Sequence, residues 1–238
     1  MDEVTFIIKT IERPQHLNAL IKSIKEFYPN VKVIVADDGK DPVIREDVEY
    51  HVLPYDTGVS AGRNFLIDHV KTPYFVILDD DFVFTEHTRI EELLRKFKAS
   101  DLDILGGAVN AGGILMDYYA TLDRDGDTIT YNRIVKSHGE YFTTDIIPFF
   151  FIARSDDEEI RFDPFFKTTE HFDFFYTMKL RKKKVGFVYN VQIDHAPGAF
   201  IQPDSYIEKR RKRGRIFLDR ILTKYDIREL ISFQETIK

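Results

Sequence analysis

The stretch Pro73-Tyr-Phe-Val-Ile-Leu-Asp-Asp-Asp-Phe-Val-Phe84 places three aspartates directly after a short apolar run. The run from Tyr74 to Leu78 has the length and composition of a buried β-strand. Three adjacent carboxylates repel one another and lower stability unless a cation or hydrogen-bond donors compensate them. The stretch therefore predicts a strand that delivers Asp79, Asp80 and Asp81 to the edge of a sheet.

Strands and helices alternate on both sides of this stretch. The expected strands are Val4 to Lys9, Val31 to Ala36 and Tyr50 to Leu53, and the expected helices are His16 to Phe27, Ser60 to Val70 and Ile90 to Phe97. Strands separated by helices of this length indicate βαβ units, and hence an α/β fold with a mostly parallel sheet flanked by helices. Ligands of such sheets bind beyond the carboxyl ends of the strands, where the aspartates are expected.

The pattern changes after a short strand at Leu102 to Leu105. Gly106-Gly107 and Gly112-Gly113 are expected to interrupt the chain, and Asp123 to Asp127 to form a hairpin turn before a polar strand. Later elements are expected at Ile146 to Ile152, Glu170 to Arg181, Val185 to Tyr189 and Val191 to His195. We expect one domain over 1–238, with a nucleotide-binding half (1–105), an acceptor-side half with a smaller antiparallel region (106–200) and a basic helical segment (201–238).

The composition excludes several classes of protein. The 238 residues are 43% hydrophobic and 14% aromatic, which is enough for a large core. Cysteine is absent, so a metal ion would have oxygen or imidazole ligands. The net charge of −6 argues against general nucleic-acid binding. No secretory leader and no membrane-spanning stretch are expected from the sequence, which favours a soluble or peripherally bound chain.

The three aspartates have the chemistry of a cation site. Alternation along an extended chain points Asp79 and Asp81 the same way, while Asp80 turns toward a ribose hydroxyl or a neighbouring loop. Oxygen ligands favour magnesium or manganese. Such an ion would neutralise the charge on a nucleotide diphosphate leaving group. The simpler alternative is a solvated acidic turn or helix cap.

Six segments carry a resemblance to a known family. They are Ile-Lys-Thr-Ile-Glu-Arg-Pro (8–14), Val-Ala-Asp-Asp-Gly (35–39), Leu-Pro-Tyr-Asp-Thr-Gly-Val-Ser-Ala-Gly-Arg-Asn (53–64), the aspartate stretch (73–84), Glu-His-Phe-Asp-Phe-Phe (170–175) and Val-Gln-Ile-Asp-His (191–195). In these segments the chain resembles inverting family 2 glycosyltransferases of the GT-A fold. It is most similar to the catalytic domain of β-1,4-N-acetylgalactosaminyltransferases. The resemblance implies a GT-A fold, an Asp-X-Asp (DXD) motif, a UDP-sugar donor and Mn²⁺ or Mg²⁺ as cofactor.

The resemblance also implies donor-binding roles for residues at the ends of the first two strands. Thr10, Glu12 and Arg13 would border the nucleotide base and phosphates. Asp38 would contact the uracil or the ribose, although an Asp-Asp-Gly sequence alone more often forms a turn.

Small residues dominate the segment 58–62. By the resemblance, Gly58, Ala61 and Gly62 would let the backbone approach the nucleotide closely, because a larger side chain there would block the ligand. Arg63 would face the nucleotide, and Asn64 would brace the loop. The alternative for Arg63 is a surface charge on a helix.

An inverting transfer needs a carboxylate that removes the proton of the acceptor hydroxyl. The resemblance implies Glu170 as this base, with Asp173 as the second candidate, where many family 2 enzymes have Glu-Asp instead of Glu170-His171. The alternative is that Glu170 only caps its helix. His195 would be the last metal ligand or a structural histidine, and His171 would orient the acceptor or the donor's sugar.

The C-terminal part is rich in basic residues. An apolar helical stripe at 216–222 is preceded by the basic run Lys209 to Arg213 and by Arg215, and it includes Arg220. Three interpretations remain open: peripheral contact with an anionic membrane, a lid over the donor phosphates, or a solvated helix packed by its apolar side.

Taken together, these features predict transfer of a sugar to a glycan or glycolipid hydroxyl. UDP-N-acetylgalactosamine is the favoured donor, then UDP-N-acetylglucosamine or UDP-galactose. The alternative is a catalytically silent GT-A module that binds nucleotide-sugar or glycan. A nucleotidyltransferase is disfavoured because no Gly-rich, Lys-bearing phosphate loop follows the first strand. We expect a cytoplasmic, bacterial-type, membrane-associated enzyme of polysaccharide or glycolipid synthesis, or an excised domain of a larger protein.

Overall fold

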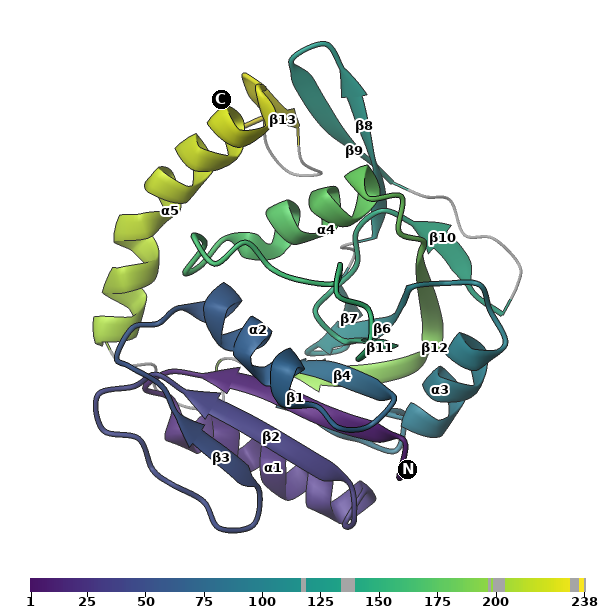
Figure 1. Cartoon of the computed structure of the whole chain (residues 1–238). Helices are drawn as coiled ribbons and strands as arrows, with labels where there is room; N and C mark the ends of the chain where they lie inside the picture. The colour runs from purple at the N-terminus through teal and green to yellow at the C-terminus, as the bar shows by residue number, and fades with distance from the viewer. Residues whose placement is uncertain (117–118, 134–139, 197, 199–203, 232–235, 238) are drawn as a thin grey trace.

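The computed structural model describes residues 1–116, 119–133, 140–196, 198, 204–231 and 236–237. Its main sheet contains β1 (Val4–Thr10), β2 (Lys32–Asp37), β3 (Glu49–Val52), β4 (Tyr74–Asp79), β5 (Phe82–Val83), β6 (Ile104–Ala111), β7 (Ile114–Leu115), β10 (Phe142–Thr144), β11 (Phe151–Arg154) and β12 (Val185–His195). Its helices are α1 (Pro14–Phe27), α2 (Val59–His69), α3 (Ile90–Lys98), α4 (Glu170–Leu180) and α5 (Asp204–Tyr225). The helices pack around the main sheet (Figure 1).

The main sheet has the order β10-β12-β6-β11-β4-β1-β2-β3, with β5 beside β12 and β7 beside β6. Strands β3, β2, β1 and β4 are parallel, as predicted from the βαβ alternation. Strand β11 is antiparallel to both of its neighbours, β4 and β6. The expected α/β fold with a mostly parallel sheet and flanking helices is therefore confirmed.

Two apolar cores cover the two faces of the sheet. Helices α1 and α3 pack on one face, where Phe6 and Ile8 of β1 point. Helices α2 and α4 pack on the other face, where Ile7 points. Successive side chains of β1 point to opposite faces of the sheet, as along any strand. Because both faces are buried, most positions of the strand are apolar.

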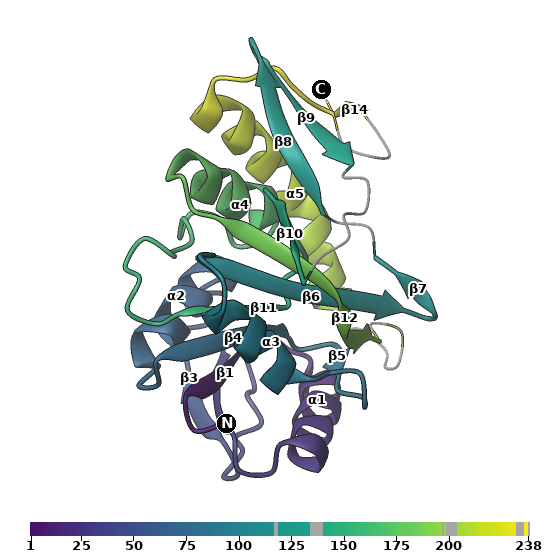
Figure 2. The ribbon, with the colours of Figure 1, turned by 90° about the vertical axis from the view of Figure 1, so that its right-hand side faces the viewer.

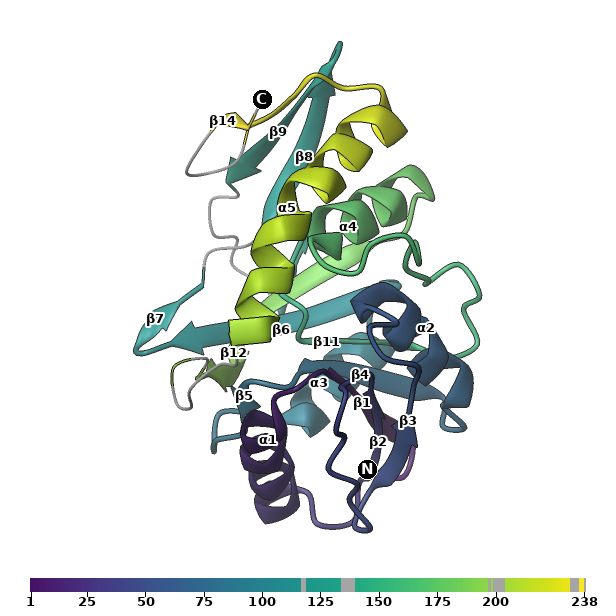
Figure 3. The same ribbon diagram turned by 90° about the vertical axis from the view of Figure 1, so that its left-hand side faces the viewer.

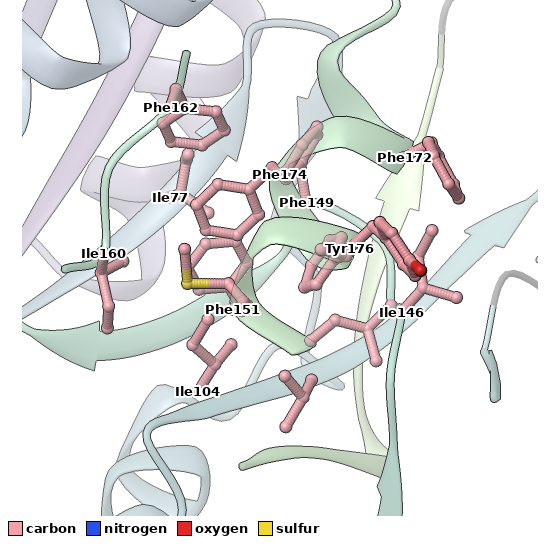
Figure 4. Close-up of a cluster of buried hydrophobic side chains, with 14 of the residues drawn as sticks. Ile77, Ile104, Ile146, Phe149, Phe151, Ile160, Phe162, Phe172, Phe174 and Tyr176 are labelled. Carbon is pink, nitrogen blue, oxygen red and sulfur yellow. The ribbon is translucent and has the colours of Figure 1, made fainter. Parts of the chain in front are cut away.

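The core beneath α4 is unusually aromatic. Figure 4 shows Phe149, Phe151, Phe162 and Phe174 gathered between α4 and the sheet. The rings of Phe162 and Phe174 are stacked with their centroids 4.2 Å apart. This cluster fixes the N-terminal end of α4 against the loop that precedes it, which matters for the site described below.

A second, four-stranded sheet lies beyond α4. It contains β8 (Ala120–Asp125), β9 (Thr128–Arg133), β13 (Glu229–Ile231) and β14 (Thr236–Ile237), in the order β14-β13-β9-β8. The predicted hairpin turn is present between β8 and β9, with Gly126 at φ 59°. Because β13 joins β9 in parallel, this sheet is mixed and not antiparallel throughout. Figures 2 and 3 show it at the end of the molecule opposite α1.

Three element predictions in the second half were wrong. Gly106 and Gly107 do not interrupt the chain but lie inside β6, where a Cβ on Gly107 would come within 2.6 Å of the Val191 carbonyl oxygen. Residues 146–150 are not in a strand, and β11 begins at Phe151. The two strands expected between 185 and 195 are one strand, β12, whose register against β6 shifts between Phe187 and Gln192.

Among the described residues, no helix combines the length and the apolar character that crossing a bilayer requires.

Candidate active site

A pocket of about 280 Å³ opens at the carboxyl ends of β1, β2 and β4. The ends of these strands meet because Thr10 pairs with Asp37, and Lys9 pairs with Asp79. The pocket is lined by the basic residues Lys9, Arg13, Arg63, Lys167 and Arg213 and by the acidic residues Asp38, Asp56, Asp79, Asp80, Asp81 and Glu170. The site is therefore densely charged with both signs, as a site for a charged ligand is expected to be.

Asp80 is held by the loop after β1. Its Oδ2 accepts hydrogen bonds from Thr10 Oγ1 at 2.7 Å and from Arg13 Nε at 3.2 Å, and its Oδ1 accepts from Arg13 Nη2. The residue is 2% exposed. Of the two predicted orientations, Asp80 therefore takes the one toward the neighbouring loop. Asp80 also lines the pocket, and its predicted contact with a ribose hydroxyl stays a prediction.

Asp81 is turned toward the end of β12. Its Oδ2 lies 3.0 Å from Arg13 Nη1 and 3.5 Å from His195 Nε2. His195 reaches this position because β12 pairs with β5, placing His195 opposite Phe82. Burial opposes ionisation of Asp81, but the hydrogen bond from His195 and the charge of Arg13 outweigh burial and hold the pKa of Asp81 below its ordinary value.

Arg63 joins the aspartate cluster to α4. Its Nη2 donates to Asp79 Oδ1 at 2.6 Å, and its Nη1 donates to Glu170 Oε1 at 2.6 Å. The guanidinium carbon also lies over the Phe149 ring, 4.0 Å from its centroid, which adds a cation–π contact. Asp79 and Glu170 are thereby held on either side of one buried cation.

Asp79 remains in an unfavourable electrostatic environment despite Arg63. Desolvation in the pocket raises the pKa of Asp79 above its ordinary value. Arg63 opposes this rise, but the negative charges of Asp81 and Glu170 add to it. An additional positive charge near Asp79 would stabilise its ionised form.

The donor set fits a divalent cation only in part. Within the described residues, no three His, Asp or Glu side chains converge as a ready-made ligand group. Asp81 and His195 are close together, whereas Asp79 is drawn toward Arg63. Magnesium-type ions are commonly held by one or two carboxylates plus substrate phosphates, without a complete protein cage. The predicted set of Asp79, Asp81 and His195 is compatible with that kind of site.

The opposite end of the pocket is built around Asp38. This carboxylate is fully buried and pairs with Lys9, while its Oδ2 accepts a hydrogen bond from the Gly58 amide at 2.7 Å. The backbone amide of Asp56 donates to the Asp38 carbonyl at 3.0 Å. Asp38 therefore orders the segment that precedes α2, and it lines the pocket as predicted.

The small residues at the start of α2 accommodate protein side chains. Gly58 has φ +96°, and a Cβ there would lie 2.6–2.9 Å from side-chain and backbone carbons of Lys167. A Cβ on Gly62 would overlap the aliphatic stem of Lys9. Neither Gly62 nor Ala61 lines the pocket. The physical reason predicted for these small residues was therefore incomplete, because the structure assigns Gly58 and Gly62 to the packing of two lysines.

Two other predictions concern the loops around the pocket. Asn64 braces the loop before α4, donating from Nδ2 to the Phe162 carbonyl at 2.9 Å and accepting from the Phe162 amide at 2.9 Å. Glu12 has φ 54° and is not part of the pocket lining, whereas its neighbours Thr10 and Arg13 are. The predicted border of the ligand site is thus made by Thr10 and Arg13.

Asp173 and His171 do not reach the pocket. Asp173 is 1% exposed and faces α5, where its Oδ1 accepts from Lys224 Nζ at 2.6 Å and from the Tyr225 hydroxyl at 2.7 Å. His171 Nε2 lies 2.7 Å from the Ile147 carbonyl oxygen. The position of Asp173 does not support the prediction of a second candidate base, because an acceptor in the pocket cannot reach its carboxylate.

Among the side chains of α5 that the structure describes, Arg213 lines the pocket. Arg215 pairs with Asp219 at 3.1 Å, and Arg220 lies over the Phe165 ring. The side chains of residues 209–211 lie outside the described part. Contact of this segment with a membrane remains a prediction.

Sequence reasoning missed three charged residues of the pocket lining: Lys9, Asp56 and Lys167. Lys9 could have been suspected, since a lysine in the apolar strand Phe-Ile-Ile-Lys-Thr must find a partner when buried. No comparable signal marks Asp56 or Lys167, which come together across 111 positions of sequence.

Comparisons with known proteins agree with this geometry. The model of glycosyl transferase family 2 matches residues 5–175. Beta-1,4 N-acetylgalactosaminyltransferase 1 of Homo sapiens is 36% identical over 207 residues, and beta-1,4 N-acetylgalactosaminyltransferase 2 of Mus musculus is 34% identical over 179 residues. These alignments cover 81% and 72% of the chain, but 39% and 35% of the relatives. The chain thus corresponds to little more than a third of each relative's length.

Solved structures show the same fold. Residues 1–349 of S. aureus TarS, in complex with UDP-GlcNAc, superimpose with a TM-score of 0.60 at 15% sequence identity, covering 87% of this chain and 64% of that fragment. This similarity concerns the fold, which is that of a GT-A glycosyltransferase. The family model over residues 5–175 and the relatives at 34–36% identity show that the chain belongs to glycosyl transferase family 2.

Proposed function

We propose that this chain transfers a sugar, with inversion at the anomeric carbon, from a UDP-sugar to a hydroxyl of a glycan or glycolipid. The observation that carries the proposal is the bridge from Asp79 through Arg63 to Glu170 inside one pocket. The bridge holds Glu170 close to Asp79, and this arrangement supports a base beside a site for the donor's cation.

The donor's diphosphate would lie at the end of the pocket formed by Asp79, Asp81 and His195. These residues would hold Mn²⁺ or Mg²⁺, which when bound supplies positive charge for the diphosphate leaving group. Arg63 and Arg13 line the same region and would orient the phosphates. The nucleoside would then extend toward Asp38 and Gly58.

Glu170 would act as the base. As the acceptor oxygen attacks the anomeric carbon, its proton passes to Glu170 and the bond from that carbon to the diphosphate oxygen breaks. Support comes from the position of Glu170 at the first turn of α4 and from its place in the pocket lining. Arg63 would keep the carboxylate oriented, with one oxygen engaged.

The identity of the sugar is proposed from the named relatives. N-acetylgalactosamine, from UDP-N-acetylgalactosamine, is the favoured donor sugar because the relatives at 34–36% identity are N-acetylgalactosaminyltransferases. UDP-N-acetylglucosamine and UDP-galactose are the next candidates.

A nucleotide-sugar panel tests the proposal. The protein is mixed with UDP-N-acetylgalactosamine, UDP-N-acetylglucosamine or UDP-galactose, each with manganese, magnesium or a chelator, and thermal stabilisation and release of UDP are measured. A ligand that binds only the folded state raises the midpoint of unfolding, and the stabilisation grows with the logarithm of its concentration above the Kd. We expect metal-dependent stabilisation and slow UDP release with one or more donors. Stabilisation without any UDP release, even with glycan and glycolipid acceptors, would instead indicate a silent binding module.

A further inference from the structure

Helix α5 is fixed firmly near its C-terminal end. Lys224 Nζ pairs with Asp163 at 2.9 Å and with Asp173 at 2.6 Å, and the Tyr225 hydroxyl donates to Asp173. Phe217, further along the helix toward the pocket, packs against Phe166. Figures 1 and 3 show α5 running from the level of the second sheet down to that of the main sheet. The helix thus spans the distance from α4 to the nucleotide-binding half.

Asp56, an acidic residue of the segment before α2, pairs with the described part of this helix. Arg213 Nη1 and Nη2 donate to the two carboxylate oxygens of Asp56 at 2.7 and 2.6 Å. Lys167 Nζ adds contacts to the Asp56 carbonyl at 2.5 Å and to its Oδ2 at 3.2 Å. All three residues line the pocket. A two-point arginine–carboxylate contact has a defined geometry, unlike a single surface ion pair.

The backbone conformation of Asp56 and a hydrogen bond of its amide fix the position of this carboxylate. Asp56 has φ 60°, a left-handed conformation that non-glycine residues seldom adopt and that aspartate tolerates better than most. Its amide donates to the carbonyl of Asp38, the buried carboxylate at the end of the pocket away from His195. The pair of Asp56 with Arg213 therefore lies at the end proposed above for the nucleoside.

We propose that Asp56 and Arg213 form a clasp that closes α5 over the nucleoside end of the donor pocket. This inference rests on the proposed function. Arg213 acts as a positioning residue through Asp56, and the closed helix supplies a wall that slows departure of the nucleotide. The clasp affects donor and UDP binding alike. It leaves the chemistry at Glu170 unchanged, because Glu170 and the aspartates proposed to hold the cation lie at the other end of the pocket.

The clasp is tested with Arg213→Gln, Asp56→Asn, the double variant and the reversed pair Asp56→Arg with Arg213→Asp. The affinity for UDP is measured by calorimetry, and kcat and the donor KM by initial rates. We expect each single variant to raise the UDP Kd and the donor KM by about tenfold, with kcat within about threefold. The double variant should be no worse than Asp56→Asn, which already weakens the contact with Arg213. The reversed pair should recover part of the affinity.

Arg215→Gln is the matched control, because Arg215 lies on the same helix but pairs with the exposed Asp219. It should leave both constants unchanged. The proposal is overturned if Asp56→Asn leaves UDP affinity unchanged or improves it while Arg213→Gln lowers it, since Arg213 would then contact the donor directly. Unchanged affinity in all variants overturns it as well.

Hydrogen exchange separates failure of the clasp from failure of the proposed function. Peptides covering 53–58 and 212–217 are followed in the ligand-free protein. Loss of the clasp should speed exchange in both peptides in Arg213→Gln, but not in Arg215→Gln. If wild-type protein binds no UDP, the proposed function fails, and this measurement still decides whether Asp56 and Arg213 fasten α5. Unchanged exchange in Arg213→Gln rejects the clasp.

Discussion

Arg63 and Glu170 are 107 positions apart in the sequence, and Nη1 of Arg63 donates a hydrogen bond of 2.6 Å to Oε1 of Glu170. The contact joins the start of α2 to the start of α4, two elements on the same face of the sheet. Because Arg63 also holds Asp79, a change at either end of this bridge alters both the donor side and the base side of the pocket.

Glu170→Gln should abolish transfer and spare donor binding. Glutamine keeps the shape and a carbonyl oxygen for Arg63, but it cannot accept the acceptor's proton. We expect transfer to fall by about 10²- to 10⁴-fold, with the Kd for UDP within about threefold of wild type. Initial rates and calorimetry provide the two measurements.

Asp173→Asn serves as the comparison for Glu170→Gln. It should keep transfer within about tenfold of wild type and lower the free energy of unfolding by about 1–3 kcal/mol, because it weakens the buried contacts with Lys224 and Tyr225. If Asp173→Asn loses transfer at full stability while Glu170→Gln retains it, the assignment of the base is reversed.

Arg63→Lys should impair catalysis although the charge is kept. An ammonium group cannot donate in two fixed directions as the guanidinium does, and it lacks the planar group that lies over the Phe149 ring. We expect kcat/KM for the donor to fall by about 10- to 100-fold, with kcat lowered along with affinity. Wild-type kinetics in this variant would show that the bridge is dispensable.

Asp81→Ala should remove metal-dependent turnover while the protein remains folded. A catalytic cation contributes several kcal/mol to the transition state, so the loss should be at least about 100-fold. Rates are measured across a manganese titration, and circular dichroism checks the fold. Asp101→Ala is the control, because Asp101 is exposed and pairs with Lys184 away from the pocket. Full activity of Asp81→Ala would remove the metal assignment.

Gly58→Ala should destabilise the protein by about 2–4 kcal/mol, because φ +96° is strained for alanine and the new Cβ would meet the backbone of Lys167. Gly112→Ala is the comparison for a positive φ without a steric contact, since Gly112 has φ +63° and open space around it. That variant should lose roughly 1 kcal/mol. Urea unfolding of both variants measures the difference, and equal losses would show that the contact with Lys167 has no cost.

His171 should make stability fall in acid. Desolvation lowers the pKa of His171 below its ordinary 6.5, so in weak acid the unfolded chain binds a proton that the folded chain does not. Its contribution is therefore fully present above pH 6.5 and is lost as the pH falls toward the folded-state pKa, by at most about 1.4 kcal/mol per pH unit. The free energy of unfolding, measured with urea between pH 5 and 7.5, should fall less steeply with decreasing pH in His171→Gln than in wild type. If the free energy of unfolding depends on pH equally in both proteins, His171 is not a source of the acid sensitivity.

Much of the fold follows from local pattern. Strand β4 is correctly predicted from the apolar run that ends at Leu78, and helix α3 from the helical spacing of Leu93 and Phe97. Both predictions succeed because the side chains that an element buries recur along the sequence with the period of that element. The pattern failed at Gly106 and Gly107, since glycine marks both turns and crowded strands. The choice depends on neighbours such as Phe150 that are distant in sequence.

By itself, the sequence determined the α/β architecture, the family and the placing of Asp79, Asp80 and Asp81 at a sheet edge, because strand periodicity and the order of short motifs are written along the chain. The tertiary structure alone decided which charges face one another. It turned Asp80 into a buried partner of Arg13, drew Asp173 away toward α5, and joined Arg213 to Asp56. These pairings depend on packing between elements more than fifty residues apart, and no local pattern encodes the direction in which a charged side chain finally points.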